Sequence, residues 1–127
     1  MSISLGNLYK DDSSDNVYWC DNYNGPAVLR LIENADVLNG VFNGTINPIT
    51  NPQSQPQGTN LINGSVLVKA DDGSPNVYLN DNYDGTWKKR FILNMDVFHS
   101  RNFKESYIQT QRASVLAGMA NGIQIGS

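Results

Sequence analysis

Two short stretches of the chain combine an acid, an amide and an aromatic ring. Residues 21–23 and 81–83 both read Asp-Asn-Tyr. A carboxylate and an amide can bond sugar hydroxyls, and a tyrosine ring can stack on an apolar sugar face. The alternative interpretation is that Asp-Asn is turn chemistry and that the tyrosine packs over the turn. The candidate carbohydrate-binding residues, with a nearby tryptophan for each stretch, are Asp21, Asn22, Tyr23, Asp81, Asn82, Tyr83, Trp19 and Trp87.

Catalytic and metal-binding patterns are weak in the rest of the sequence. His99 is the only histidine and Cys20 the only cysteine, which excludes a two-histidine metal site and an internal disulfide. Nothing near the cysteine indicates an activated thiol. The sequence has no Gly-Lys-Ser/Thr phosphate loop, no Gly-x-Ser-x-Gly elbow and no Rossmann glycine pattern. We therefore expect no catalytic residues, no metal and no cofactor, and a protein that is not an enzyme.

The recurring Asp-Asn-Tyr belongs to a longer internal repeat. Residues 11–40 match residues 71–100 at 15 of 30 positions without a gap, against roughly two matches expected by chance from average residue usage. A unit of about 60 residues has therefore been duplicated. The predicted organisation is a single domain, 1–127, with repeats at 1–46 and 61–100, a proline-rich connector at 47–60 and a C-terminal extension at 101–127.

Each repeat predicts a β-meander. Runs of β-branched and aromatic residues alternate with turn formers. The dipeptides at 24–25 and 84–85, Asn-Gly and Asp-Gly, supply the positive φ angles of a type I′ hairpin turn. A two-residue loop in the second repeat would place Tyr78 opposite Phe91. Pro26 cannot donate the N–H that closes a tight turn, so we expect a looser first hairpin.

The stretch after each hairpin turn repeats with a spacing of two. Between positions 30 and 36 the two repeats share every second residue and differ at the residues between, which is the side-chain period of a strand. We expect a third strand here. If two such strands run antiparallel about a two-fold axis, within the chain or between subunits, each arginine faces an aspartate of the other repeat. The alternative is that these side chains face solvent or loops independently. The candidate contact residues are Arg30, facing Asp96, and Asp36, facing Arg90.

The face of this stretch that differs between the repeats is apolar in the second copy. Phe91, Leu93 and Met95 predict a core face there, whereas Glu33 makes the corresponding face of the first repeat less apolar. The two repeats are therefore expected to have the same fold but different surroundings.

The connector and the C-terminal extension differ in composition. Three prolines with polar spacers in 47–60 predict an extended surface segment, either a linker or an arm that grips a neighbour. Residues 105–120 fit a short amphipathic helix and also a strand, so both remain open. Residues 123–125 predict a small terminal strand that could add to a sheet edge of this chain or of a partner.

Composition limits the classes of partner. The formal net charge of −3 argues against nucleic acid and against an anionic membrane surface, since both require a clustered positive field. No apolar run reaches the length that spans a bilayer. The N-terminal residues lack the basic start and the apolar core of a secretory signal. We expect neither a nucleic-acid partner nor a membrane partner.

The expected fold class is all-β: two tandem β-meander repeats of about 60 residues, packed as a sandwich or a partly closed barrel, with a short C-terminal helix allowed. Asparagine occurs 17 times, and only 17% of the residues are charged. A chain with so many turn-favouring residues is expected to have tight connections rather than long helices.

In its duplicated β module, its polar but weakly charged composition and its lack of catalytic motifs, the chain resembles small virion components. These include capsid decoration or cement proteins and tail or fibre parts, particularly of bacterial viruses. The resemblance implies a non-enzymatic structural protein, made in the host cytoplasm and found in the virion. Such a protein acts through contacts with other structural proteins or with itself as a homo-oligomer. The alternative function is a bivalent carbohydrate-binding, lectin-like module whose two sites would act together on glycans.

Overall fold

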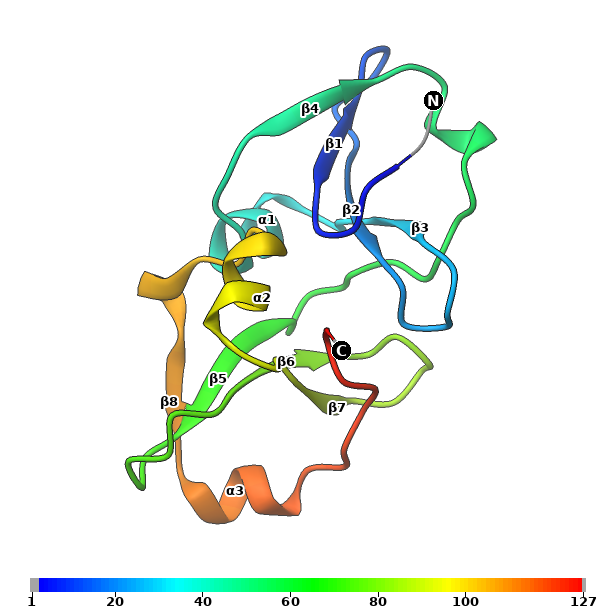
Figure 1. Ribbon diagram of the computed structural model, residues 1–127. Helices are drawn as coiled ribbons and strands as arrows, with labels where there is room; N and C mark the ends of the chain where they lie inside the picture. The colour runs from blue at the N-terminus through cyan, green and yellow to red at the C-terminus, as the bar shows by residue number, and fades with distance from the viewer. Residues whose placement is uncertain (1–2, 127) are drawn as a thin grey trace.

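Each repeat builds one four-stranded sheet. The computed structural model describes residues 3–126, so residues 1–2 and 127 of the predicted domain lie outside it. The first sheet has the order β3-β2-β1-β4 and the second the order β7-β6-β5-β8, and the two lie one above the other in Figure 1. The strands are β1 (Leu8–Asp11), β2 (Val17–Asp21), β3 (Val28–Leu31), β4 (Ile46–Ile49), β5 (Val66–Ala70), β6 (Val77–Asp81), β7 (Lys88–Phe91) and β8 (Gln109–Gln111). The fold is the predicted all-β arrangement of two repeats packed as a sandwich, and its described residues form no closed barrel.

The hairpin register in the second repeat is the predicted one. Tyr78 lies opposite Phe91, and the same offset places Tyr18 opposite Leu31 in the first repeat. The turns differ from the prediction, however. Among the described residues other than glycine, only two have positive φ, and neither lies in these hairpins. The turns are therefore not of type I′.

Both hairpin turns close in the same way. The N–H of Gly25 donates to the carbonyl of Asn22 at 3.0 Å, and the corresponding bond in the second repeat is 3.3 Å long. Gly25 has φ of +101° and Gly85 has φ of +95°, a conformation that favours glycine. The expected loosening of the first turn by Pro26 is absent, because the donor of the closing bond is the residue before the proline.

The predicted third strand is too long. β3 ends at Leu31, and helix α1 (Ala35–Val41) begins four residues later. The Asn34 side chain caps this helix by accepting from the N–H of Val37 at 3.1 Å. Asn94 caps helix α2 (Met95–Ser100) in the second repeat in the same way. The identities with a spacing of two therefore extend beyond the strand into residues that cap a helix. Both repeats keep these asparagines for helix capping and not for strand pairing.

The connector and the C-terminal extension make equivalent strand pairings in the two sheets, although their sequences differ. β4 runs parallel to β1, and β8 runs parallel to β5. Residues 57–61 then pair along the outer edge of β3, and residues 121–125 pair along the outer edge of β7. The connector is thus part of the first sheet rather than a free linker or arm. The short helices in these segments are η1 (Pro52–Ser54), η2 (Glu105–Tyr107) and α3 (Ala113–Gly118).

Residues 105–120 contain both of the structures that their sequence allowed. β8 forms the strand, and α3 forms the helix that follows it. In the stretch 123–125, the terminal strand is reduced to a parallel bridge between Ile125 and Ile92, on the chain's own sheet.

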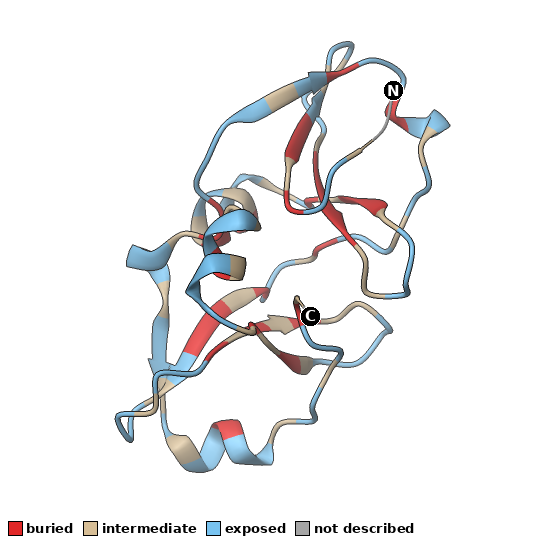
Figure 2. Cartoon of the chain, in the orientation of Figure 1, coloured by how far each residue is buried: buried red, intermediate tan, exposed pale blue. Residues whose placement is uncertain are grey.

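The main core is shared between the repeats. The indole ring of Trp19 packs against Phe42 and Phe103, with ring centroids 5.3 and 5.4 Å away. Its N–H donates to the carbonyl of Arg101, where the C-terminal extension begins after the second repeat. Figure 2 shows buried segments in both sheets and largely exposed helical surfaces around them. Within residues 3–126, no helix combines the length and apolar character needed to cross a membrane.

Candidate functional site: a buried ionic quartet and a surface groove

The aspartates of the two Asp-Asn-Tyr stretches point into the molecule. Asp21 ends β2 and Asp81 ends β6, and both are completely buried. Arg30 on β3 and Arg90 on β7 are equally buried. We call these four residues the ionic quartet. The four formal charges sum to zero. Charged side chains are tolerated in a protein interior when they are paired with opposite charges.

The strongest contacts of the ionic quartet join one repeat to the other. Arg30 donates to both carboxylate oxygens of Asp81, at 2.7 and 2.9 Å. Arg90 donates to both carboxylate oxygens of Asp21, at 2.7 and 3.3 Å. Within each repeat a single Nη1–Oδ2 contact of 3.0 Å completes the ring of charges. The bidentate pairs are thus the crossed ones, and they fix how the sheets sit against each other.

The two segments that follow the sheets satisfy the remaining donors of the arginines. The Nε of Arg30 donates to the carbonyl of Thr59 at 2.9 Å, and the Nε of Arg90 donates to the carbonyl of Ile123 at 3.0 Å. Thr59 lies in the connector and Ile123 in the C-terminal extension. Each arginine therefore joins the opposite repeat to the last segment of its own.

The two tyrosines cover the ionic quartet. The ring of Tyr23 lies 5.0 Å from the guanidinium carbon of Arg30, and the ring of Tyr83 lies 5.3 Å from that of Arg90. The two rings also contact each other, with centroids 5.3 Å apart. Their hydroxyl oxygens accept from the backbone N–H groups of Thr59 and Ile123. Cation–π contact and ring packing thus keep water from the charges.

The electrostatics follow from this arrangement. Burial alone would raise the pKa of Asp21, but the guanidinium groups of Arg90 and Arg30 outweigh it and hold that pKa below its ordinary value. Burial likewise opposes the charge of Arg30, while the carboxylates of Asp81 and Asp21 outweigh it and raise the pKa of the guanidinium. Asp21 and Arg30 are therefore charged at neutral pH.

The sugar-binding residues predicted from the sequence do not form a surface site. Asp21, Asp81 and Trp19 are wholly buried, and the two tyrosines are occupied by the quartet. Asn22 and Asn82 are half-buried beside them. Trp87 is 38% exposed and lies over Gly64, where an added Cβ would come within 2.9 Å of the ring. A carboxylate that a sugar cannot reach cannot bond its hydroxyls.

The predicted pairing of Arg30 with Asp96 and of Asp36 with Arg90 is wrong within the chain. Both arginines pair with the hairpin aspartates instead. Asp36 and Asp96 lie exposed in the first turns of α1 and α2, where a negative charge favours the helix dipole. The arginines do link the repeats as predicted, but the partner acids were missed. The signal for them was present, because Asp21 and Asp81 recur with the arginines in both copies.

The thiol of Cys20 is buried beside the quartet. Burial, together with the charge of Asp21, raises the pKa of this thiol to about 11, and Arg101 opposes the shift. The histidine lies exposed on α2. No group of three metal-ligating side chains occurs among residues 3–126. Cys20 is therefore a core residue.

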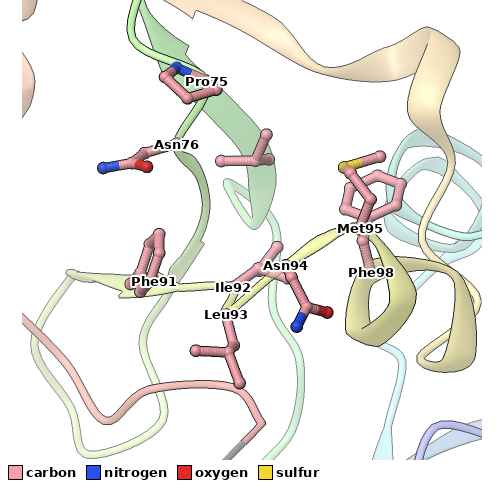
Figure 3. Close-up of a pocket in the computed structure, with 9 residues that line it drawn as sticks. Pro75, Asn76, Phe91, Ile92, Leu93, Asn94, Met95 and Phe98 are labelled. Atoms are coloured by element: carbon pink, nitrogen blue, oxygen red, sulfur yellow. The ribbon is translucent and has the colours of Figure 1, made fainter.

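The surface has a pair of cavities at equivalent places in the two repeats. One, of about 220 Å³, lies between the end of β7 and α2, and the other, of about 280 Å³, lies between the end of β3 and α1. Figure 3 shows Leu93, Met95 and Phe98 around the cavity of the second repeat. The corresponding residues of the first repeat are Glu33, Ala35 and Leu38.

The cavity of the second repeat continues into a larger depression. An open groove of about 580 Å³ shares Pro75, Val77 and Met95 with it and extends to Ile108 and Thr110 at β8. We call the two together the repeat-two groove. Leu93 and Met95 were predicted to be core residues, but Leu93 is half-buried and Met95 is 39% exposed. The chain leaves the sheet at the end of β7 and continues into α2, so these two residues do not reach the core.

No protein-family model matches the chain, and neither a curated protein nor a solved structure matches it. The function is therefore argued from the residues and the geometry of this chain.

The ionic quartet predicts an abnormal acid titration of Asp21. Because its pKa is lowered in the folded protein, the stability it contributes is present above about pH 4 and is lost as the pH falls through the folded pKa. A carboxyl-detected NMR titration should place the midpoint of Asp21 below the ordinary value of 3.8. A midpoint at or above that value would mean that the arginines do not neutralise this carboxylate.

The buried thiol predicts an unreactive cysteine. At about pH 8 the native protein should react with Ellman's reagent far more slowly than an ordinary thiol, because a pKa near 11 leaves little thiolate and the sulfur is inaccessible. After unfolding in denaturant, one thiol per chain should react at once. Rapid reaction of the native protein would contradict the placement of Cys20.

Proposed function

We propose that this protein is a non-enzymatic structural protein that works through protein–protein contacts, as a small component of a virus particle or a comparable assembly. The recurring residues whose side chains could do the most chemistry support this proposal. The four buried charges and the two tyrosines that recur in both repeats serve the architecture. Asp21, Arg30 and their counterparts at 81 and 90, which the duplication has kept, are therefore not accessible to a substrate.

The observation that carries the proposal is the unequal surface of two repeats with the same fold. Of the large hydrophobic side chains that are exposed within residues 3–126, five belong to the second repeat and its C-terminal extension, and two to the first repeat and its connector. Folding makes the same demands on both repeats, so it does not explain the difference. An excess of exposed large apolar side chains in one half of the chain favours contact with another protein. The five are Trp87, Met95, Tyr107, Val115 and Ile123, and the two are Leu5 and Ile46.

Composition supports the narrower proposal of a virion component. Asparagine occurs 17 times, and 17% of the residues are charged, a profile that resembles capsid decoration proteins and tail or fibre parts. A protein of this kind needs a rigid scaffold and an exposed contact surface rather than a reaction centre. The crossed ion pairs of the quartet supply rigidity, and the second repeat supplies an apolar surface.

The carbohydrate-binding alternative loses its proposed residues. Two of its carboxylates are inaccessible, and its tyrosine rings lie against arginines and against each other. No observation in the described part of the chain favours a sugar over a polypeptide as the ligand.

The proposal predicts self-association or docking, with no glycan specificity. In sedimentation velocity from about 10 μM to about 1 mM, the weight-average mass should rise with concentration, because apolar surface is buried when copies meet. The same preparation on a glycan array should give no specific signal. A constant monomer mass together with specific glycan binding would contradict the proposal and restore the lectin alternative.

A further inference from the structure

The outer edges of the two sheets differ in their protection against strand addition. β4 is the edge of the first sheet and β8 the edge of the second. β4 contains Pro48, which has no N–H to offer a neighbouring strand. β8 reads Gln-Thr-Gln, with neither a proline nor a charge. Natural edge strands are commonly blocked by such residues, so β8 is the edge that remains open to another strand.

The repeat-two groove opens beside this edge. Thr110 of β8 lies opposite Lys69 of β5, which in turn lies opposite Val77 of β6. The three residues therefore share one face of the sheet, and all three line the groove. Side chains on a newly added strand would alternate between the two faces. The one opposite Thr110 would stand at the mouth of the groove, with Met95 and Ile108 ahead of it.

The charges around the groove select the partner. Asp71 and Glu105 line it, and Lys69 is the one base among its lining residues. Asp96 lies exposed next to Met95. Among the lining residues, two acids against one base favour a positively charged side chain close to the apolar one.

The first repeat provides an internal comparison for this surface. At the positions of Leu93 and Met95 it has Glu33 and Ala35. Glu33 is also engaged within the chain, since its carboxylate accepts from the backbone N–H of Asn63. The same backbone can thus carry a surface with neither the apolar side chains nor the open edge, so both are particular to the second repeat.

We propose that the second repeat binds an extended segment of a partner polypeptide. The segment adds as a strand along β8, places a large apolar side chain in the repeat-two groove beside Met95, and sets a basic side chain against Asp71 and Glu105. This inference rests on the proposed assembly function and names the surface and the chemistry of the contact. Backbone pairing gives the segment its register, and the groove gives selectivity.

The test uses a synthetic peptide and the full chain. The peptide has about nine residues of alternating threonine and valine, with a central leucine followed by lysine. We expect titration of the ¹⁵N-labelled protein to shift the amide signals of residues 108–111 and of Met95. The amide signals of the equivalent residues of the first repeat, 45–47 and Ala35, should not shift. The same peptide with N-methylated backbone amides on one edge should bind at least about tenfold more weakly, because it cannot pair with β8.

Two variants test the groove with matched controls. Met95→Ala, which installs the residue of the first repeat at an exposed position, should weaken the peptide about tenfold. Leu93→Glu should also weaken peptide binding about tenfold. Its carboxylate would add to the repulsion among the acids at the groove. Ala35→Met, the reverse change in the first repeat, should leave binding unchanged. Dispersed amide spectra of all three would show that each is folded.

The outcomes separate this inference from the proposed function. Absence of peptide-induced shifts at β8 up to about 2 mM would overturn the inference, as would equal affinity of Met95→Ala and the natural chain. A peptide with glutamate in place of lysine that binds as well as the original would also overturn it. The sedimentation and glycan experiments test the proposed function independently of the peptide. If the protein associates through another surface, their expected results stay the same even though the peptide does not bind.

Discussion

The structure depends on four buried charges whose bidentate pairing neither repeat can provide alone. Removing one partner from a buried ion pair costs about 3–5 kcal/mol, and a domain of this size has roughly 5–15 kcal/mol of stability in total. A separated repeat would keep one aspartate and one arginine, but it would lose both of the bidentate contacts. The two repeats therefore form one unit, in spite of their separate sheets.

This constraint explains why three residues at and near the hairpin turns recur in both repeats. Asp21, Tyr23 and Arg30 are identical to their counterparts at 81, 83 and 90, because each one meets its counterpart or that counterpart's partner near the pseudo-two-fold axis. Other positions were kept for different reasons, such as the helix caps Asn34 and Asn94, and others have changed. Glu33 and Leu93 hold equivalent positions, yet one bonds within the chain and the other lines a surface cavity. A symmetric interior with an unequal surface is a suitable basis for a scaffold with one docking face.

The sequence was sufficient for the repeat, the all-β class and the hairpin register, because these depend on local patterns. It was misleading at Asn34 and Asp36. They continue the spacing of a strand, while their actual role is to begin a helix. The equivalence of the connector and the C-terminal extension could not be predicted, since both pair with sheet edges through backbone groups that carry no sequence signal.

The candidate site was anticipated only in part. The importance of Arg30 and Arg90 could be inferred from their recurrence. Asp21 and Asp81 recur as well, but recurrence alone does not show that they pair with the arginines. Asp21 and Arg30 are nine positions apart, and the bidentate partner of each lies in the other repeat. In a hairpin turn, an aspartate is explained just as well by turn chemistry. Only the packing of the two sheets shows that these aspartates point inward.

The most direct test of the account is a double-mutant cycle between Arg30 and Asp81, measured as the free energy of unfolding in urea. Arg30→Met and Asp81→Leu should each destabilise the protein by about 3–5 kcal/mol, because each leaves the buried cluster with one uncompensated charge. The destabilisation of the double variant should be smaller than the sum of the two single values. The difference should be at least about 2 kcal/mol, as expected for residues in direct contact. Additivity within about 0.5 kcal/mol would show that these residues do not interact, and would contradict the claim that crossed ion pairs join the repeats.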